Sequence, residues 1–163
     1  MTERWVLNAS PLIVLAHVGQ EHLFRALTDD VVVPRAVVEE IEAGPVDDRA
    51  RQAIAEGHFA IVDAVPVPEI LAWDLGGGET AVLSYALEEP GWTVILDDAA
   101  ARKCARSFDL RLKGTLAVII LAKRRGLIPS AADVLRSLLE ISFHLDERII
   151  REALSRTVGE KWE

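Results

Sequence analysis

Two adjacent aspartates, Asp97 and Asp98, directly follow the apolar run Thr93–Leu96, which is typical of a buried strand. In open parallel sheets, ligands bind beyond the carboxyl ends of the strands, so residues in this position are the first candidates for chemistry. Neighbouring carboxylates disfavour each other's ionisation. A divalent cation with oxygen ligands relieves that repulsion. We expect the pair to bind a cation and Asp98 also to cap the next helix; capping alone is the alternative.

Other polar residues could join this pair. Asn8 ends the apolar run that begins at Trp5, and Glu79 opens a predicted helix directly after three consecutive glycines. Glu79 also has a structural reading, because a carboxylate favours the positive end of a helix dipole. In a third predicted helix, Glu40 and Glu42 border the apolar face, and helical spacing does not choose between them.

The three glycines, Gly76–Gly78, also suggest a dinucleotide site. Together with the following helix, strand and Asp97-Asp98 pair, they match the back half of a dinucleotide-binding fingerprint. That fingerprint requires a strand immediately before the first glycine. Pro66 and Pro68 in the preceding segment argue against such a strand, so a dinucleotide-binding enzyme is the least favoured function.

Short apolar strands alternate with helical patterns along the chain. The expected strands are Trp5–Asn8, Val31–Val33, His58–Val65, Thr93–Leu96 and Leu110–Lys113. The expected helices are Ser10–Val18 with Ser10 as N-cap, Glu21–Leu27, Pro34–Ala43, Asp47–Glu56, Glu79–Glu88, Ala99–Phe108, Thr115–Arg125, Ser130–Ile141 and Asp146–Arg156. Strands that are continuous apolar runs indicate a parallel sheet covered on both faces. The predicted fold is a three-layer α/β/α sandwich around a short parallel sheet, with Val65–Gly78 as its most flexible stretch.

Length and composition fit one folded domain over residues 1–163. The chain is 50% hydrophobic and has a single cysteine, which excludes an intramolecular disulfide framework. Its longest apolar run, Leu116–Ala122, is far shorter than the roughly 20 residues of a membrane span. The N-terminus lacks the pattern of a signal peptide. We expect a cytoplasmic protein with no membrane association.

The net charge of −8 is unevenly distributed. Residues 1–97 carry 17 acidic and 5 basic side chains, whereas residues 98–163 carry 9 acidic and 13 basic ones. Such asymmetry suggests a polyanionic partner, but on charge alone solvated helix faces and a basic helix C-terminus are the favoured explanation of the basic residues.

Five segments, in this order, resemble the PIN-domain family, and within it a prokaryotic branch related to VapC-type toxins. They are LNASPLIVLAHVG, VVVPRAVVEEI, GGGETAVLSYALE, VILDDAAARKCAR and LKGTLAVIILAKRRGLIPS, and the resemblance extends from Leu7 to about Leu154. It implies an α/β/α sandwich and a nuclease site of clustered acids that depends on Mg²⁺ or Mn²⁺.

The resemblance also assigns positions in this chain. The acid positions fall on Asn8, Glu40, Glu79 and the Asp97-Asp98 pair, in which Asp98 is the better match. All five are expected metal ligands and the four acids are expected catalytic residues, with Asp97 or Asp98 able to accept a proton from water. The supporting positions are Ser10 and Thr115. Asn8 departs from the aspartate of most members, since its amide oxygen can coordinate a cation but brings no charge.

The expected function is therefore that of a metal-dependent ribonuclease, the toxin of a toxin–antitoxin pair, with RNA as substrate, a cognate antitoxin as partner and a homodimeric state. The ions would neutralise the scissile phosphate and activate a water. The RNA backbone would contact Arg102, Lys103, Arg106 and Lys113. The alternative is a PIN-like module that binds nucleic acid or protein with little cleavage, which the missing charge at Asn8 favours.

Overall fold

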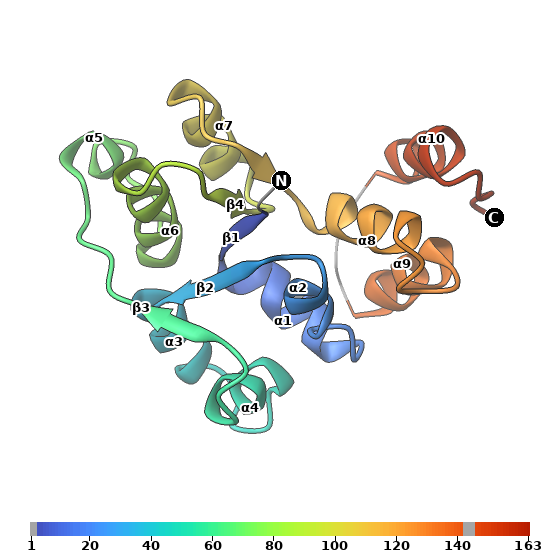
Figure 1. The fold of residues 1–163 in the computed structure, drawn as a ribbon, viewed down its shortest axis with the longest axis horizontal. Helices are drawn as coiled ribbons and strands as arrows, with labels where there is room; N and C mark the ends of the chain where they lie inside the picture. The colour runs from blue at the N-terminus through green and yellow to red at the C-terminus, as the bar shows by residue number, and fades with distance from the viewer. Residues whose placement is uncertain (1–2, 142–145) are drawn as a thin grey trace.

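The central sheet confirms the predicted α/β architecture. A computed structural model describes residues 3–141 and 146–163 (Figure 1). Its strands are β1 (Arg4–Leu7), β2 (Asp30–Pro34), β3 (Ala60–Val62), β4 (Thr93–Ile95) and β5 (Leu112–Lys113). They pair in parallel in the order β3-β2-β1-β4-β5. Each lies within or overlaps a strand expected from the apolar runs.

Helices enclose this sheet. They are α1 (Ala9–His17), α2 (Leu23–Ala26), α3 (Arg35–Glu42), α4 (Arg49–Ala55), α5 (Pro68–Leu71), α6 (Gly77–Glu88), α7 (Ala99–Ser107), α8 (Thr115–Arg124), α9 (Ala131–Glu140) and α10 (Glu147–Thr157). Helices α6 and α7 lie on one side of the strands and α1 and α2 on the other (Figure 1). The fold is thus a three-layer α/β/α sandwich. Within the described residues, no helix combines the length and apolar character needed to cross a bilayer.

Two local features differ from what the sequence predicts. The N-cap of α1 is Asn8, not Ser10, because the helix already begins at Ala9, and Ser10 lies exposed in its first turn. The stretch expected to be most flexible contains the short helix α5, which begins at Pro68 and buries Ile70 completely. A single buried side chain in a proline-rich segment does not produce the repeating apolar pattern of a helix. The sequence therefore does not predict α5.

The strand order brings two candidate site residues to neighbouring strand ends. Leu7 at the end of β1 lies opposite Ile95 at the end of β4. The chain leaves β1 toward β2 and leaves β4 toward β5, in opposite directions across the sheet. A topological switch point therefore lies between β1 and β4, where Asn8 and Asp97 follow the strands.

The C-terminal segment packs against the start of α9. The Glu160 carboxylate accepts hydrogen bonds from the backbone N–H groups of Ala131 (2.9 Å) and Ala132 (2.8 Å) and from the Ser130 hydroxyl (3.1 Å). The Trp162 side chain is buried beneath the Arg136 guanidinium. The tail thus satisfies the free N–H groups at the start of α9.

Candidate active site

Asn8 is the first residue after β1, and only one of the two polar atoms of its side chain has a hydrogen-bond partner in the described residues. The residue is 2% exposed, and its backbone N–H donates to the Ile95 carbonyl at 3.2 Å, which extends the β1–β4 pairing. The side-chain Nδ2 donates to Glu79 Oε1 at 3.4 Å. Among the described residues, the buried Oδ1 has no hydrogen-bond partner. A buried acceptor without a donor costs about 1–3 kcal/mol, so Oδ1 is suited to a ligand from outside the chain.

Glu40, on α3, approaches the same point. A Cβ atom on Gly78 would lie 2.6 Å from Glu40 Oε2 and 3.2 Å from Asn8 Oδ1. Both oxygens therefore gather over the backbone at the start of α6, and the glycine leaves room for them. Helical spacing left Glu40 and Glu42 as equal candidates, and the geometry brings the Glu40 carboxylate to this point.

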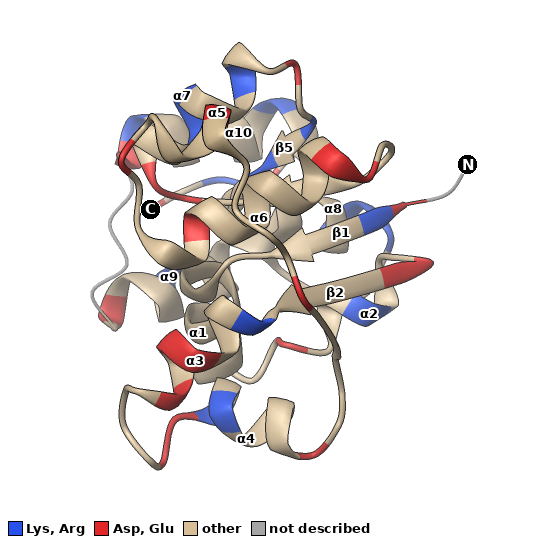
Figure 2. Ribbon diagram, turned by 90° about the vertical axis from the view of Figure 1, so that its left-hand side faces the viewer, with Lys and Arg blue, Asp and Glu red and all other residues tan. Residues whose placement is uncertain are grey.

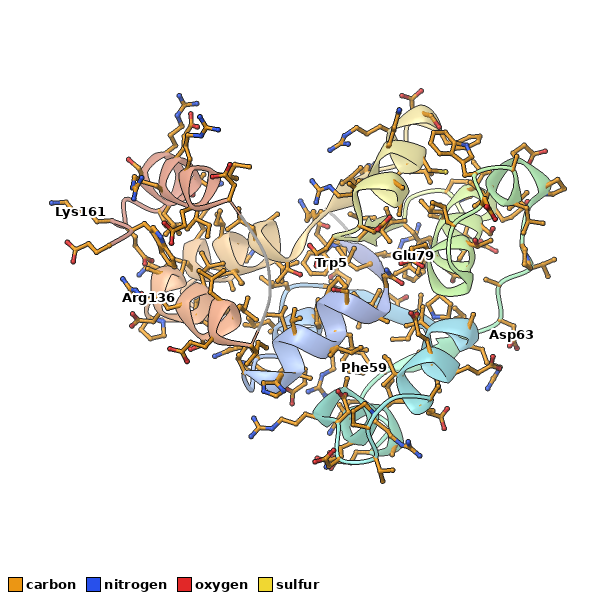
Figure 3. All side chains as sticks on the ribbon, turned by 180° about the vertical axis from the view of Figure 1, so that it is seen from behind. Trp5, Phe59, Asp63, Glu79, Arg136 and Lys161 are labelled. Carbon is orange, nitrogen blue, oxygen red and sulfur yellow. The ribbon has the colours of Figure 1, made fainter. Side chains whose placement is uncertain are left out.

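Glu79, in the first turn of α6, completes the arrangement. Its Oε1 accepts the Asn8 amide, and its Oε2 lies 2.6 Å from the position of a Cβ on Gly76. Figure 3 shows Glu79 on the part of α6 that faces the central strands. Burial of the Glu40 carboxyl and the nearby charge of Glu79 together raise the pKa of Glu40. We call Asn8, Glu40 and Glu79 the carboxylate–amide cluster.

Asp97 and Asp98 are held in different ways. The backbone N–H of Thr115 donates to Asp97 Oδ1 at 2.8 Å, and the Thr115 hydroxyl donates to Asp97 Oδ2. Thr115 is fully buried, and its two hydrogen bonds orient the Asp97 carboxylate at the start of α8. Asp98 instead caps α7 through a hydrogen bond from the Ala101 N–H to its Oδ2 at 2.9 Å, and it is exposed. The predicted cap at Asp98 is confirmed.

The cluster has the chemistry of a hard-cation site, but it is smaller than expected. Amide and carboxylate oxygens suit Mg²⁺ or Mn²⁺, and the orphaned Asn8 Oδ1 beside Glu40 Oε2 lacks only such a partner. Over residues 3–141 and 146–163, however, no three His, Cys, Asp or Glu side chains are placed to hold one metal ion. The expected convergence of Glu40, Glu79, Asp97 and Asp98 is therefore not seen. The residues present fit an ion held by two carboxylates and one amide.

Basic side chains flank the end of β4. Arg102 is half-buried beside Asp97, Lys103 and Arg106 are exposed on α7, and Lys113 is half-buried in β5. Figure 2 shows basic residues on α7 and β5, and acidic residues on α3 and α6. The basic residues of α7 and β5 thus lie near the end of β4.

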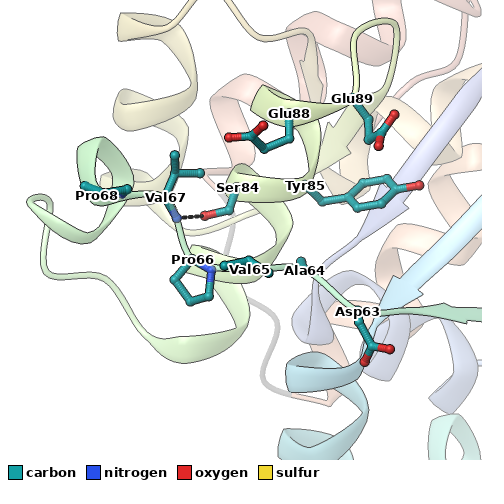
Figure 4. Close-up of a pocket in the computed structure, with 10 residues that line it drawn as sticks. All are labelled: Asp63, Ala64, Val65, Pro66, Val67, Pro68, Ser84, Tyr85, Glu88 and Glu89. Atoms are coloured by element: carbon teal, nitrogen blue, oxygen red, sulfur yellow. Dashed lines mark hydrogen bonds between the residues drawn. The ribbon is translucent and has the colours of Figure 1, made fainter.

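Two other places do not carry comparable chemistry. Gly76–Gly78 follow helix α5 rather than a strand, so the dinucleotide fingerprint lacks its required structural context. A hollow of about 490 Å³ lies where the segment Asp63–Pro68 crosses the end of α6 (Figure 4). There the Ser84 hydroxyl already accepts the Val67 N–H at 3.0 Å. None of the cluster residues lines this hollow.

The close approaches to Gly78 and Gly114 were missed from the sequence. Each glycine directly precedes a predicted site residue, Glu79 or Thr115, and that adjacency was the available signal. A glycine beside a polar candidate indicates that other groups approach the backbone there.

Comparison with known families agrees with this geometry. The sequence model of the family DUF3368, described as a PIN domain, matches residues 4–159. No curated protein sequence matches the chain. The family match covers nearly the whole chain, which therefore belongs to the PIN-domain family, a group whose members are generally nucleases.

Proposed function

We propose that this PIN-domain protein is an endoribonuclease that depends on Mg²⁺ or Mn²⁺. PIN domains typically use divalent metal ions. The single observation that carries the proposal for this chain is the buried, unpartnered Asn8 Oδ1 that shares the space over Gly78 with Glu40 Oε2. A buried amide oxygen without a donor and a carboxylate oxygen that faces the same point are together suited to a cation.

In this proposal, Asn8, Glu40 and Glu79 would hold the ion. A bound Mg²⁺ or Mn²⁺ would neutralise charge on the scissile phosphate and make a water molecule a better nucleophile at neutral pH. The Asn8 Nδ2–H donates a long hydrogen bond of 3.4 Å to Glu79 Oε1, which favours one orientation of this carboxylate before any ligand arrives. Such preorganisation avoids reorientation during the reaction.

Asp97 is the better candidate for the proton acceptor. Its two oxygens each accept one hydrogen bond from Thr115, which leaves each a further lone pair for a water proton. The Asp98 carboxylate is partly used by the α7 cap. We therefore assign proton transfer, which the sequence left open between Asp97 and Asp98, to Asp97.

The finer biological role extends this proposal. RNA as substrate, and a toxin role with a cognate antitoxin in the cytoplasm, rest on the resemblance of the five sequence segments to the VapC-type branch. A homodimer belongs to the same proposal, because the resemblance to this branch implies one. Light scattering at micromolar concentration should give twice the 17.9 kDa chain mass.

The alternative is a binding module that does not cut RNA. It is favoured by the neutral side chain at Asn8 and by the presence of only two carboxylates in the cluster. This alternative predicts RNA or protein binding that Mn²⁺ neither requires nor strengthens.

The test is cleavage of a labelled pool of single-stranded RNA with Mn²⁺ or EDTA, alongside calorimetric Mn²⁺ titration of the RNA-free protein. We expect cleavage only with Mn²⁺, and loss of both cleavage and metal binding in Glu40→Gln. Glu39→Gln is the matched control, because Glu39 is the neighbouring residue on α3, loses the same charge, and is not among the residues nearest to the space over Gly78. Binding of RNA with no cleavage under any metal would favour the binding module and refute the nuclease.

A further inference from the structure

The Arg102 guanidinium lies beside Gly114 and Asp97, just after β4, with most of its donors unused. Arg102 Nη1 donates to the Leu96 carbonyl at 3.3 Å, and this is its only side-chain hydrogen bond within the described residues. Over residues 3–141 and 146–163, no carboxylate lies within the 4.0 Å of an ion pair with this group. A guanidinium has five N–H donors, so a half-buried one with a single partner is ready for an anion.

The absence of a side chain at Gly114 leaves room for the Arg102 guanidinium. A Cβ on Gly114 would collide with Arg102 Nη1 and would lie 3.0 Å from Asp97 Oδ1. The backbone at Gly114 has φ −97° and ψ 178°, an extended conformation that any residue can adopt. Glycine is therefore needed here for room rather than for backbone freedom, and that room is occupied by Arg102 beside Asp97.

The other basic residues around the site differ from Arg102 in burial. Lys103 and Arg106 are exposed on α7, where solvent and salt screen their charge. Arg102 is half-buried at the end of β4, and water screens it less. Its fork of N–H groups also matches two oxygens of one phosphate, whereas lysine provides a point charge.

We propose that Arg102 binds the phosphate group at the cleavage position through two N–H donors, and that Gly114 is required to place it there. The exposed basic residues would then attract RNA without contacting that phosphate specifically. This inference rests on the proposed function, because the phosphate is taken to belong to an RNA that the protein cleaves.

The experiment compares Arg102→Gln with Arg106→Gln, which loses the same charge from the same helix at an exposed position. After the cleavage position is mapped, binding is measured in EDTA to a short RNA and to the same RNA with one methylphosphonate there, which removes one phosphate charge. The parent should bind the modified RNA about tenfold to hundredfold more weakly. Arg106→Gln should retain this loss. Arg102→Gln should bind both RNAs equally and lower kcat/KM by a similar factor.

Two further variants distinguish loss of the phosphate contact from misfolding. Arg102→Lys keeps the charge but not the fork, so it should recover less than half of the lost binding free energy, with an unchanged Tm. Gly114→Ala should reproduce the Arg102→Gln phenotype. If the parent cleaves RNA and Arg102→Gln keeps the full methylphosphonate effect, the inference is wrong while the proposed function stands. A parent that cleaves no RNA refutes the proposed function instead, and with it the inference.

Discussion

Gly78→Ala should separate metal binding from stability. Gly78 is buried in the first turn of α6, where a Cβ would lie 2.6 Å from Glu40 Oε2 and 3.2 Å from Asn8 Oδ1. The Glu40 oxygen is the end of a flexible side chain and can move away. The Asn8 oxygen belongs to a buried side chain and can move only slightly. The added methyl group therefore disperses the cluster without opening the core.

Gly78→Ala should change the unfolding free energy little but weaken Mn²⁺ binding clearly. Alanine in place of glycine within a helix stabilises by up to about 1 kcal/mol. Crowding of Asn8 offsets a part of this, so the unfolding free energy should stay within about 1 kcal/mol of the parent. For a chain of this size that is a change in Tm within about 4 °C. Loss of the Glu40 ligand position should weaken Mn²⁺ binding by about tenfold or more.

Gly77→Ala is the matched control, because a Cβ on Gly77 meets nothing within 4 Å. Calorimetric Mn²⁺ titration and thermal melts of both variants in EDTA decide the result. We expect Gly77→Ala to bind Mn²⁺ as the parent does and Gly78→Ala to bind it weakly, with both folded. Normal Mn²⁺ binding by a folded Gly78→Ala would refute the assignment of the space over Gly78 to a metal. A much lower Tm would show that the glycine serves packing instead.

Three other perturbations follow from the same structure. Burial and the charge of Glu79 raise the pKa of Glu40, so ionisation of Glu40 opposes folding. Glu40→Gln should therefore raise the Tm in EDTA near pH 7, and this gain should vanish below about pH 4. A gain in Tm that does not change with pH would contradict this prediction. Burial alone would raise the pKa of Glu160, but its hydrogen bonds lower it below the usual 4.5. Stability from Glu160 is thus present above that value and lost as the pH falls, so Glu160→Ala should lower the Tm at pH 7 by about 4–8 °C (about 2 kcal/mol), with little difference from the parent in acid melts near pH 3. Asn8→Asp should bind Mn²⁺ more tightly and melt lower in EDTA; equal affinity by calorimetry would remove Asn8 from the ligands.

The elements of the fold were predictable because their signals are local. Apolar runs mark all five strands, and glycine, proline and capping residues bound most of the helices, as Asp98 does for α7. The strand order has no local signal, since it depends on which apolar runs pair across the chain. Helix α5 escaped prediction because the burial of Ile70 alone anchors it.

The site was predictable in its residues and less so in their arrangement. Asn8, Glu40 and Glu79 were each identified, and the structure brings them together at Gly78. Adjacency in the sequence suggested that Asp97 and Asp98 act as a pair. They diverge because successive residues at a strand end point in different directions, so one meets Thr115 and the other caps its own helix.

Asn8 explains how such a cluster can form before a metal binds. An aspartate at this position would place a third carboxylate beside Glu40 and Glu79, with no donor between them, and like charges at such distances oppose ionisation. The asparagine replaces that repulsion with a hydrogen bond from Nδ2 to Glu79, while its Oδ1 still faces the same point as Glu40 Oε2. The same substitution lowers the negative charge available to a cation. The amide thus favours a stable metal-free site with weaker ion binding, whereas Asp97 is held separately by its two hydrogen bonds from Thr115.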